Sequence, residues 1–301
     1  MNHTAFKKKV NVGLIVLLAP AIIVVVLIIG YPLVRALGLS LYRYKLTDLL
    51  NSGFIGLNNY KDIIFNDPAF NAAFVNTIIW VGVTVVCQVL CSLVLANVLN
   101  KPFWGRGVIR SIVLIPWATP CVLIALMWSW MFNGNYGVIN EILKDFNVIS
   151  QNVAWLAMSE TSLGSQILVM VWQGIPFFTI MLLAAMQLIP SELYESADVD
   201  GAGPVRKYFS ITLPGISATL VSTVMIRLIW VFNNVDIVYI MTGGGPGYSS
   251  LTLSVYTFIE AQKSLNFGYA SALAIIGAIF MAIVMLVYMR MARSRGGIVD
   301  R

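Results

Sequence analysis

The segment ESADVDGAGPVRKYFSITLP (Glu195–Pro214) holds five charged residues, whereas the whole 301-residue chain is 59% hydrophobic and only 11% charged. Its helix-forming residues are interrupted by Gly201, Gly203 and Pro204, residue types that end or redirect helices. A segment this polar, in a chain that is otherwise apolar, predicts a structured element that lies outside the apolar part of the fold. Where it lies depends on the apolar segments around it.

The apolar residues form six long blocks. Soluble domains carry about 25% charged residues, more than twice the 11% found here. Each block supplies the ~20 residues that a membrane-spanning helix needs. The blocks are approximately Asn11–Leu33, Phe74–Leu99, Val108–Phe132, Leu163–Ile189, Ile216–Met241 and Tyr269–Met291. We therefore expect an all-α integral membrane protein with six transmembrane helices and a single domain over residues 1–301.

The first block follows Lys7, Lys8 and Lys9, as the apolar part of a signal peptide would. Its apolar run is longer than the roughly 7 to 15 residues usual in signal peptides. We therefore interpret it as a retained transmembrane helix.

Lysine and arginine are unevenly divided between the two sides that six helices define. One side carries twelve: Lys7, Lys8, Lys9, Lys101, Arg106, Arg110, Arg206, Lys207, Arg290, Arg293, Arg295 and Arg301. The other carries six: Arg35, Arg43, Lys45, Lys61, Lys144 and Lys263. Because cytoplasmic segments are enriched in these residues, we expect the first side, with both termini, to face the cytoplasm. The net charge of +6 then follows from topology and requires no nucleic-acid partner.

Residues 190–215 connect the fourth and fifth blocks on the expected cytoplasmic side, and we call them the 190–215 knob. Ser191 is a reasonable N-cap for a helix that Gly201 would end, and Pro204 can open a second short helix. A connection between antiparallel helices needs only a few residues. The knob is therefore either a solvated loop on the membrane surface or a docking element for a cytoplasmic partner.

The knob resembles the EAA loop of ABC-transporter permease subunits. That pattern is Glu-Ala-Ala, a nearby Gly, then Ile-x-Leu-Pro, with Ser196 in place of the first Ala here. In the family this loop is the coupling helix that sits in a cleft of the ATP-binding subunit. The resemblance implies that the ATPase-coupling residues are Glu195, Ser196, Ala197, Asp200, Gly201, Ala202, Ile211, Leu213 and Pro214.

Four other segments narrow the resemblance to the larger-type sugar permeases of carbohydrate importers, related to maltose and glycerol-phosphate systems. They are FIGLNNYKDII from Phe54, IPWATP from Ile115, MTGGGPGYSSLTLSVYTFIEAQ from Met241 and NFGYASALA from Asn266. The resemblance covers about Leu14 to Arg290, with a permease core over about residues 70–291. It implies six helices in a type I importer permease fold.

The glycine loop, Thr242–Tyr248, invites comparison with a phosphate-binding loop. Such a loop needs Lys and then Ser or Thr after its last glycine, but Tyr248 follows Gly247 here. No other segment fits the phosphate-loop pattern, so we expect this chain to bind no cofactor, with ATP and Mg²⁺ used by a separate ATPase subunit. On the extracytoplasmic side, the loop is either a rim where a substrate-delivering protein docks or a purely structural turn.

Arg227 is the first pointer to a transport site, because a charge near the centre of a spanning helix costs roughly 2.5 to 3.5 kcal/mol or more unless it faces a cavity or partner. Asn234 lies seven residues on and shares its helix face. Alternatively, Arg227 pairs with another helix or snorkels. Asp236 is about 13.5 Å from Arg227 along a continuous helix, too far for a direct pair.

Further candidates follow from the resemblance to maltose-type permeases. The fourth block carries WQGIPFF from Trp172, with an aromatic surface, an amide and a helix weakened by Gly174 and Pro176. Gln173, Cys121 and Arg227 differ from the maltose-type residues, and each aromatic is alternatively a packing residue or an interfacial anchor. The substrate-binding set that the resemblance implies is Trp117, Cys121, Trp172, Gln173, Gly174, Phe177, Arg227 and Asn234.

Enzymatic interpretations find little support in the sequence. His3 is the only histidine, and the three cysteines, Cys87, Cys91 and Cys121, all lie in apolar blocks, as packing residues do. The acidic residues of the knob have no neighbours in the sequence that would form a pocket with them. We therefore expect no catalytic site and no metal site.

The sequence therefore predicts a permease subunit of an ATP-driven carbohydrate importer in the bacterial inner membrane. Its expected partners are a homologous second permease, two ATP-binding subunits, an extracytoplasmic sugar-binding protein and membrane lipid. An ion-coupled secondary transporter is the alternative, although only Arg227 and Asp236 are ionisable at membrane depth. A structural or assembly protein would leave the shared face of Arg227 and Asn234 unexplained.

Overall fold

The computed structural model describes residues 12–294. His3 and the basic residues of both tails (Lys7, Lys8, Lys9, Arg295 and Arg301) lie outside the described residues. The described chain is helical except for loops and one antiparallel hairpin, β1 (Tyr42–Arg43) with β2 (Gly53–Phe54). The all-α expectation is confirmed.

Five segments of the described chain are long and apolar enough to span a membrane, and a sixth span results if one bent helix pair is counted. The five are Leu17–Leu39, Pro68–Asn100, Ser162–Gln187, Ser217–Met241 and Phe267–Ala292. They belong to α1 (Val12–Val25) with η1 (Val26–Gly30) and α2 (Tyr31–Leu39), to α4 (Pro68–Asn100), to α8 (Ser162–Gln187), to α12 (Ser217–Phe232) with α13 (Asp236–Met241), and to α15 (Phe267–Ser294).

The sequence analysis predicted one transmembrane helix for the third apolar block. The structure shows two helices there instead. The block divides into α5 (Arg106–Ala118) and α6 (Cys121–Met131), which meet at 93°. Thr119 is extended at the break, with φ −79° and ψ 133°, as expected for a residue before proline. Pro120 cannot donate a backbone hydrogen bond, so the helix cannot continue through it. At 1.5 Å per residue, α5 is about 20 Å long, short of the ~30 Å hydrocarbon core.

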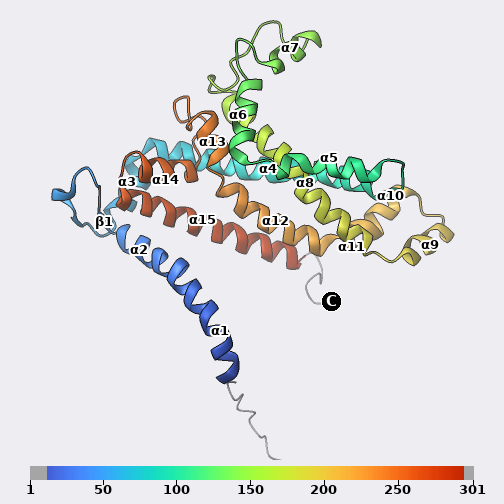
Figure 1. Cartoon of the computed structure of the whole chain (residues 1–301), viewed down its shortest axis with the longest axis horizontal. Helices are drawn as coiled ribbons and strands as arrows, with labels where there is room; N and C mark the ends of the chain where they lie inside the picture. The colour runs from blue at the N-terminus through green and yellow to red at the C-terminus, as the bar shows by residue number, and fades with distance from the viewer. Residues whose placement is uncertain (1–11, 295–301) are drawn as a thin grey trace, which may run out of the picture.

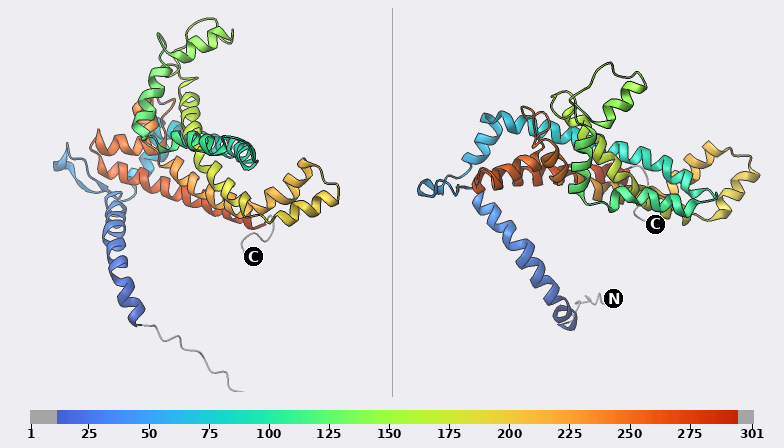
Figure 2. Two further views of the ribbon diagram at one scale, coloured as in Figure 1. Left: turned by 45° about the vertical axis from the view of Figure 1, so that its right-hand side comes forward. Right: turned by 45° about the horizontal axis from the view of Figure 1, so that its top comes forward.

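Four long helices form the bundle that holds the core. Helices α4, α8, α12 and α15 run side by side, and α5 lies against α8 (Figures 1 and 2). Trp80 of α4 and Phe178 of α8 are fully buried between them. The shorter α3 (Asn58–Asn66) and α14 (Leu253–Gln262) cluster at one end, while α7 (Val138–Asp145) extends away beyond α6 (Figure 1).

The first span diverges from this bundle. Segment α1–η1–α2 leaves it at the α2 end, where α2 contacts α15, and runs outward alone (Figure 1). None of its apolar window is buried within the chain. Its surface must therefore be covered by lipid or by another subunit.

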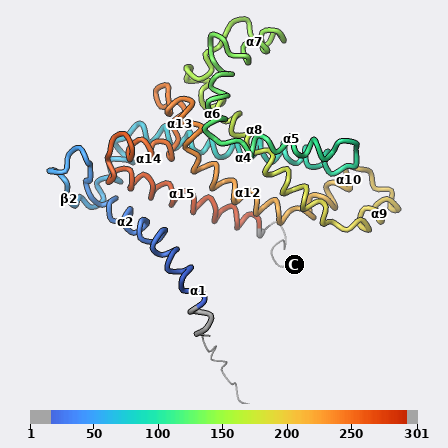
Figure 3. The backbone as a smooth tube through the Cα atoms, in the orientation of Figure 1, coloured from blue at the N-terminus to red at the C-terminus, as the bar shows by residue number. Residues whose placement is uncertain are grey.

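The 190–215 knob stands at the end of the bundle opposite α3 and α14, together with the α4–α5 connection (Figure 3). Helix α9 (Ser191–Val199) ends as expected at Gly201, which has a left-handed φ of 70°. Ala202 donates to Ala197 O at 2.8 Å and Gly201 to Asp198 O at 3.0 Å. This is the Schellman arrangement, which satisfies the last carbonyls of a helix.

Two details of the knob differ from the sequence interpretation. Ser191 is the first helical residue and Pro190 takes the N-cap position, with no side-chain cap bond. Pro204 does open a helix, α10 (Pro204–Lys207), but that helix is not separate. It continues through the π-helical η3 (Tyr208–Thr212) and α11 (Leu213–Gly215) toward α12. Pro214 has no N–H, so the α-helical hydrogen bond to Ser210 O cannot form. This explains why the helix takes the wider π-helical turn here.

Candidate functional site

The fifth span is interrupted at Asn233–Val235, between α12 and α13. Side chains satisfy the polar groups that this break releases: Trp80 Nε1 donates to Val231 O at 2.9 Å, and Ser254 Oγ donates to Phe232 O. Ile237 N donates to Asn234 Oδ1 at 3.3 Å. Non-helical backbone at membrane depth is stable only where protein or a water-filled cavity surrounds it. The break is thus a stable part of the fold, held by specific hydrogen bonds from neighbouring helices.

Arg227 is buried on α12, with 2% of its surface exposed. Its Nε donates to Gln88 Oε1 of α4 at 3.0 Å, and Gln88 Nε2 donates to Met170 O of α8 at 2.6 Å. A Cβ atom on Gly174 would lie 2.0 Å from Gln88 Nε2 and 2.2 Å from Arg227 Nη2. Glycine at position 174 therefore makes room for both polar side chains between α4, α8 and α12.

Three aromatic rings from different helices, Trp117, Phe177 and Trp230, form a row beside this group, the aromatic row. Trp117 stacks on Phe177 with centroids 6.2 Å apart, and Phe177 contacts Trp230 at 5.0 Å. Arg227 Cζ lies 6.0 Å from the Trp230 ring centroid. Trp117 and Trp230 are each 45% exposed, so the row offers aromatic faces to a ligand or another subunit.

The remaining predicted substrate residues form separate contacts. Asn234 Nδ2 donates to Cys121 Sγ at 3.5 Å, which joins the α12–α13 break to the start of α6. Trp172 packs edge-on against Trp128 at 5.6 Å. Gln173 has a buried Oε1 without a hydrogen-bond partner in the described chain.

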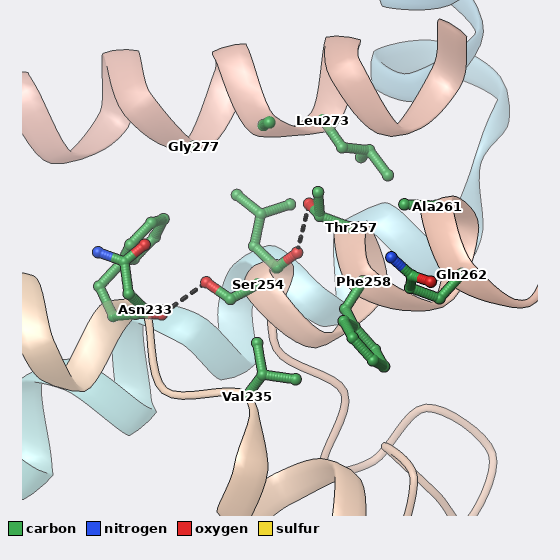
Figure 4. Close-up of a pocket in the computed structure, with 12 residues that line it drawn as sticks. Asn233, Val235, Ser254, Thr257, Phe258, Ala261, Gln262, Leu273 and Gly277 are labelled. Carbon is green, nitrogen blue, oxygen red and sulfur yellow. Dashed lines mark hydrogen bonds between the residues drawn. The ribbon is translucent and has the colours of Figure 1, made fainter. Parts of the chain in front are cut away.

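The structure thus brings Gly174 and Arg227 into one cluster, Trp117 and Phe177 into a row beside it, and Cys121 next to Asn234. Trp172 packs instead with Trp128. None of the predicted residues lines the cavity of about 320 Å³ that lies between α12, α14 and α15. Figure 4 shows that cavity: Ser254 and Thr257 face it, but their hydroxyls are already bonded to backbone carbonyls.

Two residues of this site were missing from the sequence interpretation. Gln88 is the one amide between Asn76 and Asn97 in the middle of α4, and that position was the available signal. Trp230 lies three residues after Arg227, a spacing that places two side chains on one helical face. Both could have been included by applying to them the reasoning used for Arg227 and Asn234.

The glycine loop folds against α4 and α8 near α13. Gly243, Gly244 and Gly247 have positive φ angles, and Tyr248 shares this conformation at 69°. Asn76 Nδ2 donates to Tyr248 O at 2.8 Å, and Gln166 Nε2 donates to Thr242 Oγ1 at 2.8 Å. The loop is therefore fixed in place, with Tyr248 half exposed at its tip.

The knob presents an exposed and partly apolar surface. Val199 is 90% exposed, Val205 70% and Leu193 50%. The hydroxyls of Tyr194 and Thr212 bond at 2.9 Å, and Lys207 pairs with Asp198, so α9 is held against the helix that follows. Of the predicted coupling residues, Glu195, Ser196, Asp200, Gly201 and Pro214 are exposed, and Ala197, Ala202, Ile211 and Leu213 are half-buried.

Residues 88–294 match the family described as "Binding-protein-dependent transport system inner membrane component". The chain belongs to this family. The matched range begins at Gln88 and contains the knob and every predicted substrate residue. The resemblance to ABC-transporter permeases is thereby confirmed.

Relatives from three organisms carry transport names. The sulfoquinovosyl glycerol transport system permease protein of Agrobacterium fabrum is 37% identical, over 93% of this chain and 90% of that protein. The trehalose/maltose transport system permease protein of Thermococcus litoralis is 33% identical, over 96% of each. The diacetylchitobiose uptake system permease protein of Streptomyces coelicolor is 31% identical, over 91% and 84%. This member of the family is thus a transport component of the inner membrane, not an enzyme.

A solved structure shows the same fold. A bacterial ABC transporter involved in the import of the acidic polysaccharide alginate matches with a TM-score of 0.80 and 23% identity, over 96% of both chains. The likeness includes the bundle, and it confirms the expected importer-permease fold for this family member.

Proposed function

We propose that this chain is the membrane-spanning subunit of an ATP-driven importer that carries a carbohydrate into the cytoplasm by alternating access. The observation that carries the proposal is the 190–215 knob. It is held rigidly by its Schellman end and the Tyr194–Thr212 bond, yet its apolar side chains are exposed at one end of the bundle. Exposed apolar groups on a rigid element mark a docking surface.

The names of the relatives support a carbohydrate as the transported molecule. They specify sulfoquinovosyl glycerol, trehalose and maltose, and diacetylchitobiose. The transport site is the cluster of Arg227 and Gly174 with the aromatic row, Trp172, Gln173, Cys121 and Asn234. Aromatic faces and a few fixed polar groups at an interrupted helix are the usual features of a transport site.

The proposed complex contains a homologous second permease, two ATP-binding subunits and an extracytoplasmic sugar-binding protein. The unburied first span supports contact with another subunit or lipid, and the rigid glycine loop supports docking of the binding protein. ATP and Mg²⁺ are used by the ATPase subunits, and both termini of this chain face the cytoplasm. ATP and sugar shift the site between outward and inward states because they bind those states unequally.

Uptake of labelled sugar by proteoliposomes that carry the assembled complex tests the proposal, with Gly201→Trp as the variant. Gly201 has open space around it but a left-handed φ, which a tryptophan disfavours. Uptake and sugar-stimulated ATP hydrolysis should both collapse while assembly persists. Gly53→Trp is the matched control, since Gly53 also has open space and lies in β2, at the opposite end of the bundle. Normal transport by Gly201→Trp, or transport by this chain alone without ATP, would favour the ion-coupled secondary transporter.

A further inference from the structure

Arg227 is a buried cation without a counter-charge among the described residues. The ion pairs of this part of the chain are Lys144–Glu141 and Lys207–Asp198, both far from it in sequence. Within residues 12–294, its only hydrogen bond goes from Nε to the neutral Gln88 amide, and Nη2 is buried without a partner. The guanidinium group therefore keeps one buried donor, Nη2, beside the space that Gly174 leaves, and the described chain supplies no acceptor for it.

This arrangement is costly unless an anion completes it. A guanidinium group stays protonated in proteins, so Arg227 cannot avoid the cost by becoming neutral. A charge at the centre of a spanning helix costs roughly 2.5 to 3.5 kcal/mol or more, and one neutral amide does not offset its charge. Carboxylate and phosphate groups match the guanidinium fork with two parallel hydrogen bonds.

The surroundings fix the position of the free Nη2 donor. Met170 O holds Gln88 Nε2, so Gln88 Oε1 faces Arg227, and Gly174 leaves the space that Nη2 occupies. Trp230 lies beside the guanidinium group and connects it to the aromatic row, whose outer members are exposed. The cation is thus adjacent to ring faces on which a sugar can stack.

Asp236 is the acidic residue that comes nearest along the chain, and it does not neutralise Arg227. It lies nine positions later, beyond the break at Asn233–Val235, and it is exposed and forms no ion pair with any residue that the structure describes. The counter-charge must therefore come from outside the described residues, either from the cargo or from a partner subunit.

We propose that Arg227 binds the anionic group of the transported molecule, so that the cargo is a carbohydrate bearing a sulfonate, carboxylate or phosphate. This inference rests on the proposed function and specifies its substrate class. Because Nη2 is buried, the anion reaches it when the side chains packed around Arg227, Trp230 among them, move as the site changes between its two states. The aromatic row then holds the sugar ring while the guanidinium group selects for charge.

The test is uptake by proteoliposomes that carry the complete complex with its binding protein. The probes are three labelled pairs, each an acidic sugar with its neutral counterpart: sulfoquinovosyl glycerol with glucosyl glycerol, digalacturonate with digalactose, and glucose 6-phosphate with glucose. We expect the wild-type complex to prefer at least one acidic probe over its neutral counterpart by tenfold or more. Arg227→Met should abolish that preference, and Arg227→Lys, which retains the charge but not the fork, should keep part of it.

Thermal stability of the complex distinguishes a cargo anion from an acid of the partner permease. Methionine is apolar and of similar length, so Arg227→Met should leave the melting temperature unchanged or higher if the cargo supplies the anion. A lower melting temperature with equal loss of acidic and neutral uptake would assign the counter-charge to the partner and overturn the inference. Preferred uptake of neutral probes would overturn it as well, while leaving the proposed function intact. Uptake of none of the probes would overturn both.

Discussion

Gly174 shows how one residue sets the geometry of the candidate site. It lies on α8 opposite both Gln88 and Arg227, which come from helices far apart in the sequence. In an ordinary helix a glycine costs about 1 kcal/mol relative to alanine. Here the missing side chain allows two polar groups to meet at membrane depth, so the larger residue is the unfavourable one.

Gly174→Ala should therefore reduce sugar uptake by tenfold or more and lower the melting temperature of the complex. The added methyl group would displace Gln88 from Met170 O or from Arg227, and overpacking of this kind costs about 1–3 kcal/mol. The matched control is Gly164→Ala on the same helix, where a Cβ meets nothing within 4 Å. The control should transport normally, and equal behaviour of the two variants would contradict the steric account.

At the scale of elements, Asp67 joins three helices at the end of the bundle that lies opposite the knob. Its Oδ1 accepts from Ala69 N at 2.9 Å, which caps α4. Its Oδ2 accepts from the hydroxyls of Tyr256 on α14 and Tyr269 on α15, at 2.7 and 2.6 Å. Burial, followed by the bond to Asp67, raises the pKa of Tyr256, so this hydroxyl stays protonated and remains a donor.

Asp67→Ala should destabilise the complex clearly, because it removes a helix cap worth about 1 kcal/mol and two bonds to a charged acceptor worth about 1.5–3 kcal/mol each. The melting temperature, followed by tryptophan fluorescence of the purified complex, should fall by about 5 °C or more. Asp67→Asn should lose roughly half as much, since an amide oxygen still accepts hydrogen bonds. Asp62→Asn, whose side chain makes an exposed bond on α3, is the control. A shift as large in that control would refute the role assigned to Asp67.

The sequence predicted some structural elements and missed others, and each outcome has a physical reason. Span positions followed from hydrophobic length, and the ends of the knob helices followed from local chemistry at Gly201 and Pro204. Pro120 was visible as a point of weakness in the third block, but the apolar composition continues across it and gave no indication that the two halves meet at 93°. The contact of Arg227 with Gln88 joins residues 139 positions apart, and no local pattern reports such a pairing.

At the scale of the whole molecule, the two ends of the bundle are built from different elements. The knob and the α4–α5 connection lie at one end, with Lys101, Arg106, Arg206 and Lys207 among their residues (Figure 1). The β1–β2 hairpin, α3 and α14 lie at the other. In the proposed orientation, which follows the enrichment of positive charge on the cytoplasmic side, the knob end faces the cytoplasm, where an ATPase subunit could reach it.

Labelling with a membrane-impermeant maleimide can measure this orientation directly. Cys87, Cys91 and Cys121 are first replaced by serine or alanine, and sugar uptake by that background is checked. Leu50→Cys, at a fully exposed position beside the hairpin, should then react in intact spheroplasts, while Lys101→Cys, exposed at the end of α4, should react only after lysis. The reverse pattern would place the knob outside the cell, away from ATP. The coupling mechanism proposed for the knob would then be physically impossible, whatever the family of the chain.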